Sequence, residues 1–485
     1  MRLQARVLSE TDQARIHNQS LRILAEVGVR CHGHKALKIL QDGGARVDWE
    51  DKIARIPREV VEWAVLSCPK AFVLGARNPA FNWSVPSPVS RYAIDGTAAF
   101  AIDFESGKRR YGTRQDIQDS LRVFQQADLG VMAWAPTCAA DAPAHSRALH
   151  EFFAMIKFSS KHGQHELHRV EQVPYLVAGL KAIHGSEDEI KARKDYSLIY
   201  CTIAPLAHDG QMLDAYVELG ELDMPVTIMS MPVNGTTGPA SLFSNVALAN
   251  AEILSAIVIY QLAHPGRPLL HCSATGSVDF RSGGYLAGTP EMGLQSAALV
   301  EMGRFYGLPT VSAGCTSDAK EPGPEAVIEK LVTTIPPVLA GADLIVGFGV
   351  IESDQVLILE QILVDNEIAH LCQRLWEGVD GSPEKDLAED IGEVGPGGHF
   401  LLSKSTRRIA RSGEFYMSGL FDHHTYEAWM DLGKPSLYST ARERVEAILA
   451  GPLVDPLPAR TVEALDEILR AADKELEDGE HPSPA

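Results

Sequence analysis

The feature that most constrains the fold of this chain is a repeated alternation of short apolar segments and amphipathic segments. The apolar segments have the length of strands, recur roughly every 30 to 40 residues, and are each followed by a segment with helical periodicity. This order is typical of parallel strands joined by helical crossovers. Seven strands are predicted, at Gly130–Trp134, His162–Glu166, Ser197–Thr202, Val226–Ser230, Leu269–Ser273, Thr310–Gly314 and Leu344–Gly349.

Gly398–Leu402 is our candidate for an eighth strand. The segments between the seven predicted strands are predicted to be helices. Eight such units close a barrel, whereas an open sheet covered by helices on both faces rarely needs so many. We therefore predict an α/β fold built on a (β/α)8 TIM-type barrel. The predicted helices are Arg114–Gln126, His145–Ser159, Val170–Ile183, Met212–Leu222, Ala240–Leu262, Glu291–Tyr306 and Glu325–Leu339.

This interpretation divides the chain into three parts. Residues 1–112 are predicted to form an N-terminal helical segment followed by a β-rich connector, and residues 113–419 to form the barrel as the catalytic domain. Residues 420–485 are predicted to be a helical extension that wraps around the barrel or forms a dimer contact. The tail from Glu475 to Ala485 is charged and contains prolines, so we expect it to be frayed.

Charge and cysteine content exclude several classes of partner. The formal net charge is -20 and the isoelectric point is about 5.3, so nucleic acid is not expected as a partner. There is no basic amphipathic stretch for a membrane surface, no signal-peptide core and no apolar run long enough to span a bilayer. The seven cysteines are dispersed without a CxxC pair, which predicts reduced thiols and a cytoplasmic protein.

The active site of a closed barrel lies at the carboxyl ends of its strands, so the residues just beyond each predicted strand form a shortlist. Aromatic, acidic and imidazole side chains dominate it, and arginine is scarce. Such a set suits a cation that is bound by aromatic faces with carboxylates nearby. We add two aromatic residues to this shortlist, Phe100 from the predicted connector and Tyr285 from a loop. The candidate substrate contacts are then Phe100, Trp134, His165, Glu166, His271, Tyr285, Asp318, Lys320, Phe348 and Glu352.

Simpler interpretations stay open for several of these residues. Ordinary core packing also explains Trp134. Because side chains alternate along a strand, only one of His271 and Cys272 points inward, and a polar position in the core also explains either residue. The run from Lys161 to His168 contains three histidines, but their spacing of three places neighbours on opposite faces of a strand, so we do not predict a metal site there.

Two loops carry further alternatives. The turn Asn234–Gly238 is glycine-rich, but it lacks the spacing of known phosphate-binding loops, and a tight loop at the barrel mouth is the simpler interpretation. Lys320 follows the sixth predicted strand and has the chemistry of a Schiff-base nucleophile, although it lies on the loop and not on the strand.

Six longer stretches resemble the trimethylamine methyltransferase family, and the likeness covers nearly the whole chain. That resemblance implies a (β/α)8 barrel and a methylated amine as the substrate. The stretches are IDGTAAFAIDFESGKRRYGT (94–113), MPVNGTTGPASL (231–242), NAEILSAIVIYQLAHPGRPLLH (250–271), AGCTSDAKEPGPEAVIEK (313–330), EQILVDNEIA (360–369) and VGPGGHFL (394–401).

The family's archetype uses pyrrolysine on a tertiary amine, in or near the loop matched here by Cys315–Lys320. This sequence contains no pyrrolysine, and Lys320 is an ordinary lysine. The chain therefore resembles the branch that demethylates quaternary amines such as glycine betaine. That resemblance implies methyl transfer to cob(I)alamin on a separate corrinoid protein, so cobalamin is expected to arrive with the partner. It implies no catalytic acid, base, nucleophile or metal on this chain, and we expect a homo-oligomer.

Two other functions are weighed against this one. The first is a Schiff-base or metal-assisted barrel lyase centred on Lys320 or His165. The second is a binding protein that keeps the barrel as a quaternary-amine sensor or as a docking module for the corrinoid protein. Which quaternary amine is used does not follow from the sequence.

Overall fold

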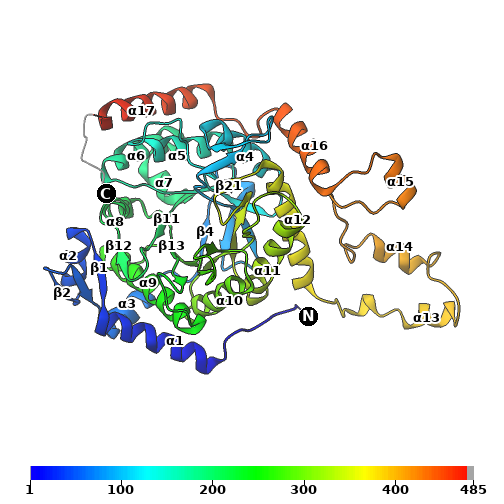
Figure 1. The fold of residues 1–485 in the computed structure, drawn as a ribbon, viewed down its shortest axis with the longest axis horizontal. Coiled ribbons are helices and arrows are strands. Elements are labelled where there is room, and N and C mark those ends of the chain that lie inside the picture. Colours follow the sequence, from blue (N-terminus) through cyan, green and yellow to red (C-terminus); the bar gives the residue numbers. More distant parts are fainter. Residues whose placement is uncertain (1, 478–485) are drawn as a thin grey trace.

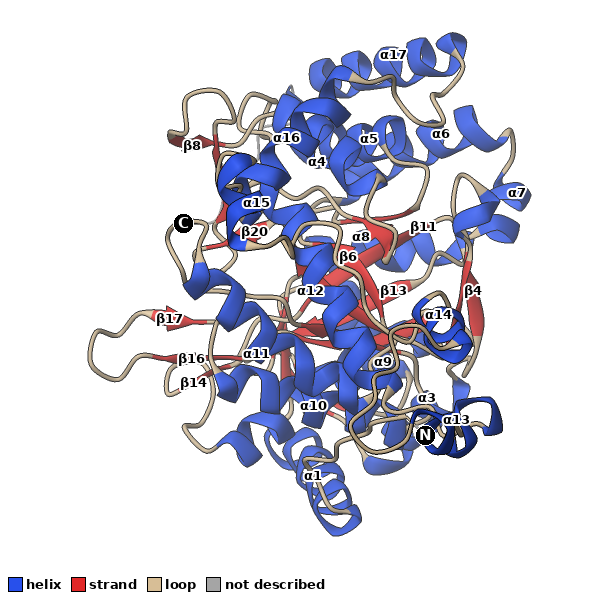
Figure 2. Ribbon diagram, turned by 90° about the vertical axis from the view of Figure 1, so that its right-hand side faces the viewer, coloured by secondary structure: helices blue, strands red, loops and turns tan. Residues whose placement is uncertain are grey.

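A closed barrel of eight parallel strands forms the centre of the computed structural model, which describes residues 2–477 (Figures 1 and 2). All seven predicted strands are present and lie in the barrel, so the predicted fold class is confirmed. Around the barrel the strands follow the order β10 (His162–His165), β11 (Tyr196–Cys201), β13 (Val226–Ser230), β15 (Leu269–Ser273), β18 (Thr310–Ala313), β19 (Leu344–Phe348), β6 (Arg91–Ile94) and β9 (Gly130–Ala133).

The eighth strand is not the one that we predicted. Residues Gly398–Leu402 form turns, and Leu401 and Leu402 are 76% and 72% exposed, so the strand prediction for this segment is wrong. Its glycines and proline favour turns over a paired strand. Instead, β6 closes the barrel by pairing with β19 on one side and β9 on the other. The barrel thus begins at Arg91, while the division of the chain into three domains stays a proposal.

Helices cover the outside of the barrel, and their positions agree with the predicted ones. Helix α4 begins at Thr113, whose hydroxyl accepts a hydrogen bond from the backbone N–H of Asp116 in a reciprocal capping box. Helix α9 is long and apolar enough to cross a membrane, but most of it is buried against the barrel as a core helix. The covering helices are α4 (Arg114–Gln125), α5 (Arg147–Phe158), α6 (Val173–His184), α7 (Glu187–Arg193), α8 (Gln211–Glu218), α9 (Leu242–Ala263), α10 (Pro290–Phe305), α11 (Pro324–Ala340) and α12 (Leu359–Glu377).

Residues 2–85 pack beside the barrel as small helices and strands. Helices α1 and α3 lie on α9, and a four-stranded sheet joins β1, β2 and β3 to β12 of the barrel region. The elements are α1 (Glu10–Arg22), α2 (His34–Asp42), α3 (Arg58–Ser67), β1 (Val29–Cys31), β2 (Arg46–Asp48), β3 (Ile53–Arg55) and β12 (Ala207–His208), with the hairpin β4 (Phe72–Leu74) and β5 (Trp83–Val85).

Two small sheets stand at the carboxyl ends of the barrel strands, and Figure 2 shows both on the left side of the molecule. The first joins elements that follow β6 and β19, and the second joins elements that follow β13 and β15. Their strands are β7 (Phe100–Ile102), β8 (Arg109–Tyr111), β20 (Val350–Ile351) and β21 (Val356–Leu357), and β14 (Val233–Asn234), β16 (Gly276–Val278) and β17 (Tyr285–Leu286).

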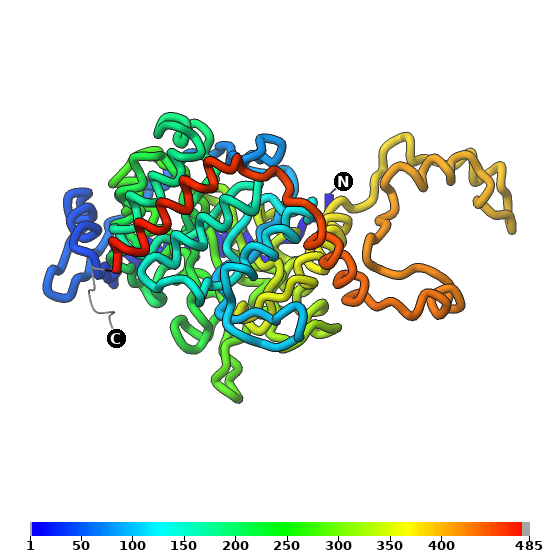
Figure 3. The backbone as a smooth tube through the Cα atoms, turned by 90° about the horizontal axis from the view of Figure 1, so that it is seen from above, coloured from blue at the N-terminus to red at the C-terminus, as the bar shows by residue number. Residues whose placement is uncertain are grey.

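The last part of the chain leaves the barrel after α12 and returns to it. Residues 378–435, which we call the arm, project away from the barrel with α13 (Ala388–Val394), α14 (Lys404–Ala410) and α15 (Tyr426–Asp431) (Figures 1 and 3). Helices α16 (Leu437–Ala450) and α17 (Ala459–Glu477) then pack on the outer helices. Of the tail predicted to be frayed, residues 475–477 end helix α17 instead, and the rest lies outside the described residues.

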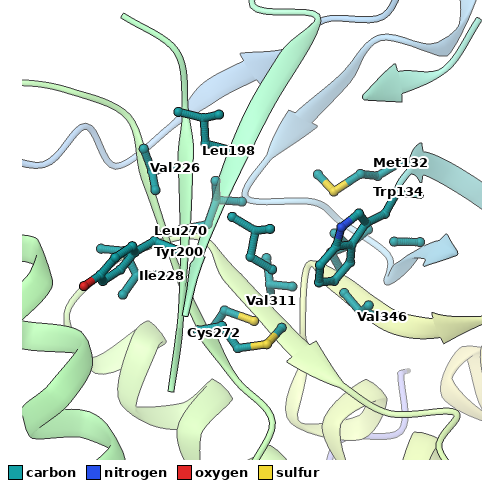
Figure 4. Close-up of a cluster of buried hydrophobic side chains, with 14 of the residues drawn as sticks. Met132, Trp134, Leu198, Tyr200, Val226, Ile228, Leu270, Cys272, Val311 and Val346 are labelled. Atoms are coloured by element: carbon teal, nitrogen blue, oxygen red, sulfur yellow. The ribbon is translucent and has the colours of Figure 1, made fainter. Parts of the chain in front are cut away.

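Strand register decides which side chains face the barrel interior. Tyr92 of β6 stacks on Phe348 and so faces the outer helices, which turns its neighbours Ala93 and Asp95 inward. Figure 4 shows the two faces of the wall: Met132, Trp134 and Val346 lie on one side of β11, β13 and β15, and Tyr200 and Ile228 on the other.

Candidate functional site

Two carboxyl groups meet at the seam where the barrel closes. Asp95 follows β6 and points inward, and Asp354 lies in the loop between β20 and β21, which follow β19. The two side chains are close enough to share a hydrogen bond. Both stay partly accessible to solvent, so a ligand that enters the barrel mouth can reach them.

This pair holds a proton between its members. Burial raises the pKa of Asp95, and burial together with the neighbouring Asp95 carboxylate raises the pKa of Asp354 well above its usual range. Two carboxylates in contact do not both ionise readily near neutral pH. The pair therefore carries about one negative charge at neutral pH, with the proton mainly on Asp354.

Strained backbone places Asp354 against Asp95. Glu352, Ser353 and Asp354 are three successive non-glycine residues with positive φ angles of 57°, 52° and 64°, a conformation that costs roughly 1–2 kcal/mol per residue. Asp318 clamps this loop, because it accepts hydrogen bonds from the hydroxyl of Ser353 (2.7 Å) and from the backbone N–H of Ala287 (2.7 Å). Asp318 thus fixes the loop of Asp354 and the strand of Tyr285 together.

Two aromatic rings lie beside the carboxyl pair. Trp134 packs against Gly96, where an added Cβ would lie 2.0 Å from the indole ring, and Tyr285 packs against Gly276 in the same way at 2.2 Å. The indole N–H of Trp134 and the hydroxyl of Tyr285 are buried without a hydrogen-bond partner among residues 2–477. Asp95, Asp318 and Asp354 all lie near enough to Tyr285 to raise its pKa further, after burial as the main cause. Both atoms are free to bind a ligand or a water molecule, since buried polar groups normally have partners.

Glu166 contributes a third carboxyl group to the interior, from the end of β10, which only β9 separates from β6. It follows β10, and register turns it inward. Its side chain is 13% exposed, and burial raises its pKa. His165 and His168 act against this rise, and the Nε2 of His168, which is more than half exposed, lies 3.9 Å from the carboxylate.

A buried ion pair stands behind the seam. The ammonium of Lys330 on α11 lies 2.9 Å from the carboxylate of Asp365 on α12, and both side chains are fully buried. Lys330 also donates hydrogen bonds to the carbonyls of Cys315 (2.6 Å) and Gly347 (3.1 Å), so it ties the ends of β18 and β19 together. Its positive charge lowers the pKa of Asp95 and that of Asp354 against the effect of burial.

Of the predicted contact residues, the structure brings Trp134, Glu166, Tyr285 and Asp318 to this region. Three others face the outer helices. His165 lies 3.1 Å from the Glu151 carboxylate on α5, and His271 lies 3.3 Å from the Asn250 side chain on α9. Phe348 stacks on Tyr92 and meets Phe124 of α4 edge-on. We leave these three out of the proposed site because they are on the outer face of the barrel wall.

The remaining three predicted contacts lie at the rim. Phe100 stacks on Tyr111, with the Arg109 guanidinium 3.5 Å from its ring centre, so both of its faces are occupied. Glu352 forms an ion pair with the same arginine at 3.1 Å. Lys320 is exposed, and its ammonium donates to the carbonyl of Asp318 in its own loop.

The alternatives raised by sequence find little support in the geometry. His162 points to the barrel interior and contacts the carbonyl of Gly75 and the hydroxyl of Ser197, whereas His165 faces outward, so these histidines do not converge. Within residues 2–477 no group of three or more histidine, cysteine or acidic side chains is arranged to hold a metal ion. The turn Asn234–Gly238 closes on itself through the hydrogen bond from Gly235 N–H to Gly238 carbonyl.

Sequence reasoning missed Asp95 and Asp354. Asp95 directly follows the strand Arg91–Ile94, which we had assigned to a connector, so the rule that points to strand ends was not applied there. Asp354 stands beyond the last predicted strand, two residues after Glu352. A correct choice of the closing strand finds Asp95, and a search two residues farther beyond the last predicted strand finds Asp354.

Comparisons with known proteins give a consistent result. The model of the family described as trimethylamine methyltransferase (MTTB) matches residues 2–476. The chain is 32% identical to the trimethylamine methyltransferase of Methanosarcina thermophila over 452 residues, which cover 92% of both chains. It is 30% identical to the glycine betaine methyltransferase of Desulfitobacterium hafniense, over 93% of this chain and 94% of that protein. The crystal structure of the Methanosarcina barkeri monomethylamine methyltransferase matches 96% of this chain and 86% of its own, at 11% identity and a TM-score of 0.47.

Proposed function

Because this chain belongs to the trimethylamine methyltransferase family, we propose that it takes a methyl group from a quaternary amine and passes it to cob(I)alamin on a partner corrinoid protein. The observation that carries this proposal is the pairing of Asp95 and Asp354 with Trp134 and Tyr285 inside the barrel. The relative that is named a glycine betaine methyltransferase also supports a quaternary substrate.

The interior side chains fit the head group of a quaternary amine. Such a head group is a cation with no N–H, so it cannot use ordinary hydrogen-bond acceptors and is bound by aromatic faces and by unpaired negative charge. Trp134 and Tyr285 supply the aromatic faces, and the Asp95–Asp354 pair and Glu166 supply the charge. The unpartnered hydroxyl of Tyr285 is free to orient the rest of the substrate.

The chemistry explains why this chain needs no acid for the leaving group. A quaternary nitrogen already carries a positive charge, so it leaves as a neutral amine when its methyl carbon is attacked, and it keeps the electron pair of the broken C–N bond. When bound, cob(I)alamin supplies the attacking electron pair. The protein's own task is to hold one methyl group in line with the mouth and to exclude water.

The rim fits a cofactor that arrives on another protein. Ile203, Met231 and Phe280 are 45%, 37% and 75% exposed, and they follow β11, β13 and the strand β16 beyond β15. In our proposal these apolar side chains contact the partner that carries the corrin ring. The carboxyl pair lies at the seam of β19 and β6, across the barrel from β11 and β13.

The charge of the site favours one group of quaternary amines over another. A substrate carboxylate needs a positive partner, but His165 and His271, two of our predicted substrate contacts, face outward, and Lys330 is already paired with Asp365. We therefore propose that compounds with a net positive charge, such as choline, bind more tightly than zwitterions such as glycine betaine. A carboxylate close to the nitrogen is repelled by Asp95 and Glu166.

A substrate panel tests the proposal. The protein is incubated with cob(I)alamin and with choline, glycine betaine, carnitine, proline betaine or trimethylamine, and the cobalamin spectrum is followed. Methyl transfer from a quaternary compound is expected, and reaction with trimethylamine alone contradicts the proposal. Tight binding in calorimetry without methyl transfer, even with added corrinoid proteins, favours the sensor or docking protein instead.

We propose a cytoplasmic location from the state of the thiols. All seven cysteines are free, and burial raises the pKa of each of them: to about 11 for Cys138, to about 12 for Cys31, Cys68 and Cys372, and well above the usual range for Cys201, Cys272 and Cys315. Buried, unreactive thiols without disulfides support our proposal of a cytoplasmic protein.

A further inference from the structure

If the proposed function holds, the group that leaves the substrate is a tertiary amine, and a tertiary amine is a base. Breaking the C–N bond needs no acid, but the electron pair of that bond stays on the nitrogen. Alkylamines bind a proton with a pKa similar to that of a lysine side chain, about 10.4. As long as the electron pair is free, the amine can take the methyl group back. A proton on the nitrogen prevents this return, so a proton donor beside the nitrogen favours the forward reaction.

Two acidic sites inside the barrel are candidate donors, the Asp95–Asp354 pair and Glu166. Burial raises the pKa of Glu166, but two neighbouring histidines favour its ionised form, so Glu166 is better suited to supply charge than to supply a proton. Tyr285 is a far weaker acid, because burial raises the pKa of its hydroxyl further above the usual range. The pair is therefore the stronger candidate.

Hydrogen bonds distinguish the two members of the pair. Asp95 accepts a hydrogen bond from the backbone N–H of Gly96 (2.8 Å), which favours its ionised form. Asp354 Oδ1 is buried and accepts no hydrogen bond from an N–H or O–H group of residues 2–477. A carboxyl group without donors around it keeps its proton more readily than one with a donor. The proton that the two groups share therefore belongs mainly to Asp354.

The charges around Asp354 decide whether it can give up this proton. Asp95 and Asp318 oppose its ionisation, and Lys330 favours it. The quaternary substrate has no N–H group, whereas the protonated product donates an N–H hydrogen bond to a carboxylate. Such charge-assisted hydrogen bonds are about twice as strong as neutral ones. The product therefore stabilises the ionised Asp354 in a way that the substrate cannot.

We propose that Asp354 gives its proton to the tertiary amine that leaves. The C–N bond of the substrate breaks, the methyl group passes to the acceptor, and the electron pair stays on the nitrogen. The O–H bond of Asp354 then breaks and an N–H bond forms, while the electron pair of the O–H bond remains on the carboxylate. When the product departs as an ammonium ion, the pair takes up one proton from the solvent. The acid thus acts after bond cleavage.

The test counts the protons that the full-length protein releases when it binds an amine. Calorimetric titrations at pH 7 in two buffers of different ionisation enthalpy give this number. The ligands are choline and dimethylaminoethanol, the amine that remains when choline loses a methyl group. Dimethylaminoethanol is protonated in solution, so its binding is expected to release about one proton, because the bound amine and the pair together hold one fewer. Choline leaves the proton on the pair and is expected to release few or none.

Three variants identify the donor. Asp354→Asn removes the transferable proton while Asp95 keeps its charge, so the release with dimethylaminoethanol is expected to vanish. Glu352→Gln is the matched control, because it makes the same change in the same loop and the Glu352 carboxylate pairs with Arg109 at the rim. This control and Glu166→Gln are expected to release as many protons as the wild type. Loss of the release in Glu166→Gln but not in Asp354→Asn overturns the proposal.

Infrared spectroscopy of the wild-type protein gives a second readout that depends on no variant. The carbonyl band of a protonated carboxyl group is expected to remain when choline binds and to disappear when dimethylaminoethanol binds. Equal proton release with both ligands, or a band that remains with both, overturns the proposal. If choline gives up its methyl group but dimethylaminoethanol releases no proton, the proposed function stands and the proton donor does not. If no quaternary amine gives up a methyl group, both fail.

Discussion

Replacing Asp95 and Asp354 singly and together is a sharp test of cation binding, because the shared proton makes the three variants behave differently. In Asp354→Asn the amide imitates the protonated acid, and Asp95 keeps its charge. In Asp95→Asn the like charge that helps to raise the pKa of Asp354 disappears, while burial, the larger cause, remains, so the pKa falls and Asp354 becomes the group of the pair that can ionise. Each single variant keeps one carboxyl group that can carry the charge, and the double variant keeps none.

The expected magnitude follows from the charge that is lost. At a separation of about 5 Å and an effective dielectric constant near 20, one carboxylate attracts a quaternary ammonium by about 3 kcal/mol. This corresponds to a dissociation constant that is roughly 200-fold larger in the double variant. The single variants are expected to stay within about fivefold of the wild type, since they lose only shape and a hydrogen bond.

Calorimetric titration with choline measures the affinity, and thermal unfolding checks the fold. The folded-state pKa values of the pair are raised, so the pair costs stability at neutral pH, and that cost is relieved as the pH falls through the folded values. The double variant should therefore unfold at a higher temperature than the wild type at pH 7, and this gain should shrink on acidification. Binding equal to wild type in the double variant refutes the cation site. If each single variant loses as much choline affinity as the double variant, the two carboxyl groups do not share a proton.

Three further predictions concern single features of the structure. Trp134→Leu should weaken choline binding by about 1–2 kcal/mol while leaving the neutral analogue 3,3-dimethylbutanol nearly unaffected, as calorimetry can show; equal losses for both ligands argue against a cation–π contact. Lys330→Met leaves the Asp365 carboxylate buried alone and should cost about 3–5 kcal/mol in urea unfolding, which Lys330→Met/Asp365→Leu should largely restore; wild-type stability of the single variant contradicts the buried pair. Burial lowers the pKa of Lys161 from 10.5 to about 7. Lys161 therefore makes the free energy of unfolding rise between pH 7 and pH 10, and this stabilisation is lost as the pH falls. In Lys161→Met, urea unfolding at several pH values should show a smaller rise over this range.

The barrel could be predicted from the sequence because parallel strands buried on both faces read as apolar runs, and β13 and β15 match their predicted ranges residue for residue. The closing strand could not be predicted, because Arg91–Ile94 is short and lies in a turn-rich region whose sequence pattern fits a connector equally well. Its partner β19 lies far away along the chain, so no local sequence pattern predicts that the two strands pair.

The site was predictable only where it depends on strand ends. Trp134 and Glu166 were found because they follow strands with clear boundaries. His165 and Phe348 face outward because alternation within β10 and the irregular register of β19 at Gly347 decide the side, and a strand end alone does not. Tyr285 was chosen as an aromatic residue, but its place beside the carboxyl pair depends on the Asp318 clamp, which joins segments far apart in the chain.

The position of Asp95 and Asp354 at the barrel seam has a consequence for synthesis and folding. Asp95 is made early and Asp354 late, and only the pairing of β6 with β19 brings them together. A nascent chain that has not yet released β19 from the ribosome therefore has no complete site, whatever the state of its other strands. Because the unfolded carboxyls are ionised near neutral pH and the closed pair is not fully ionised, ring closure should take up a proton from the buffer. A stopped-flow refolding trace with a pH indicator should thus record the moment at which the site is assembled.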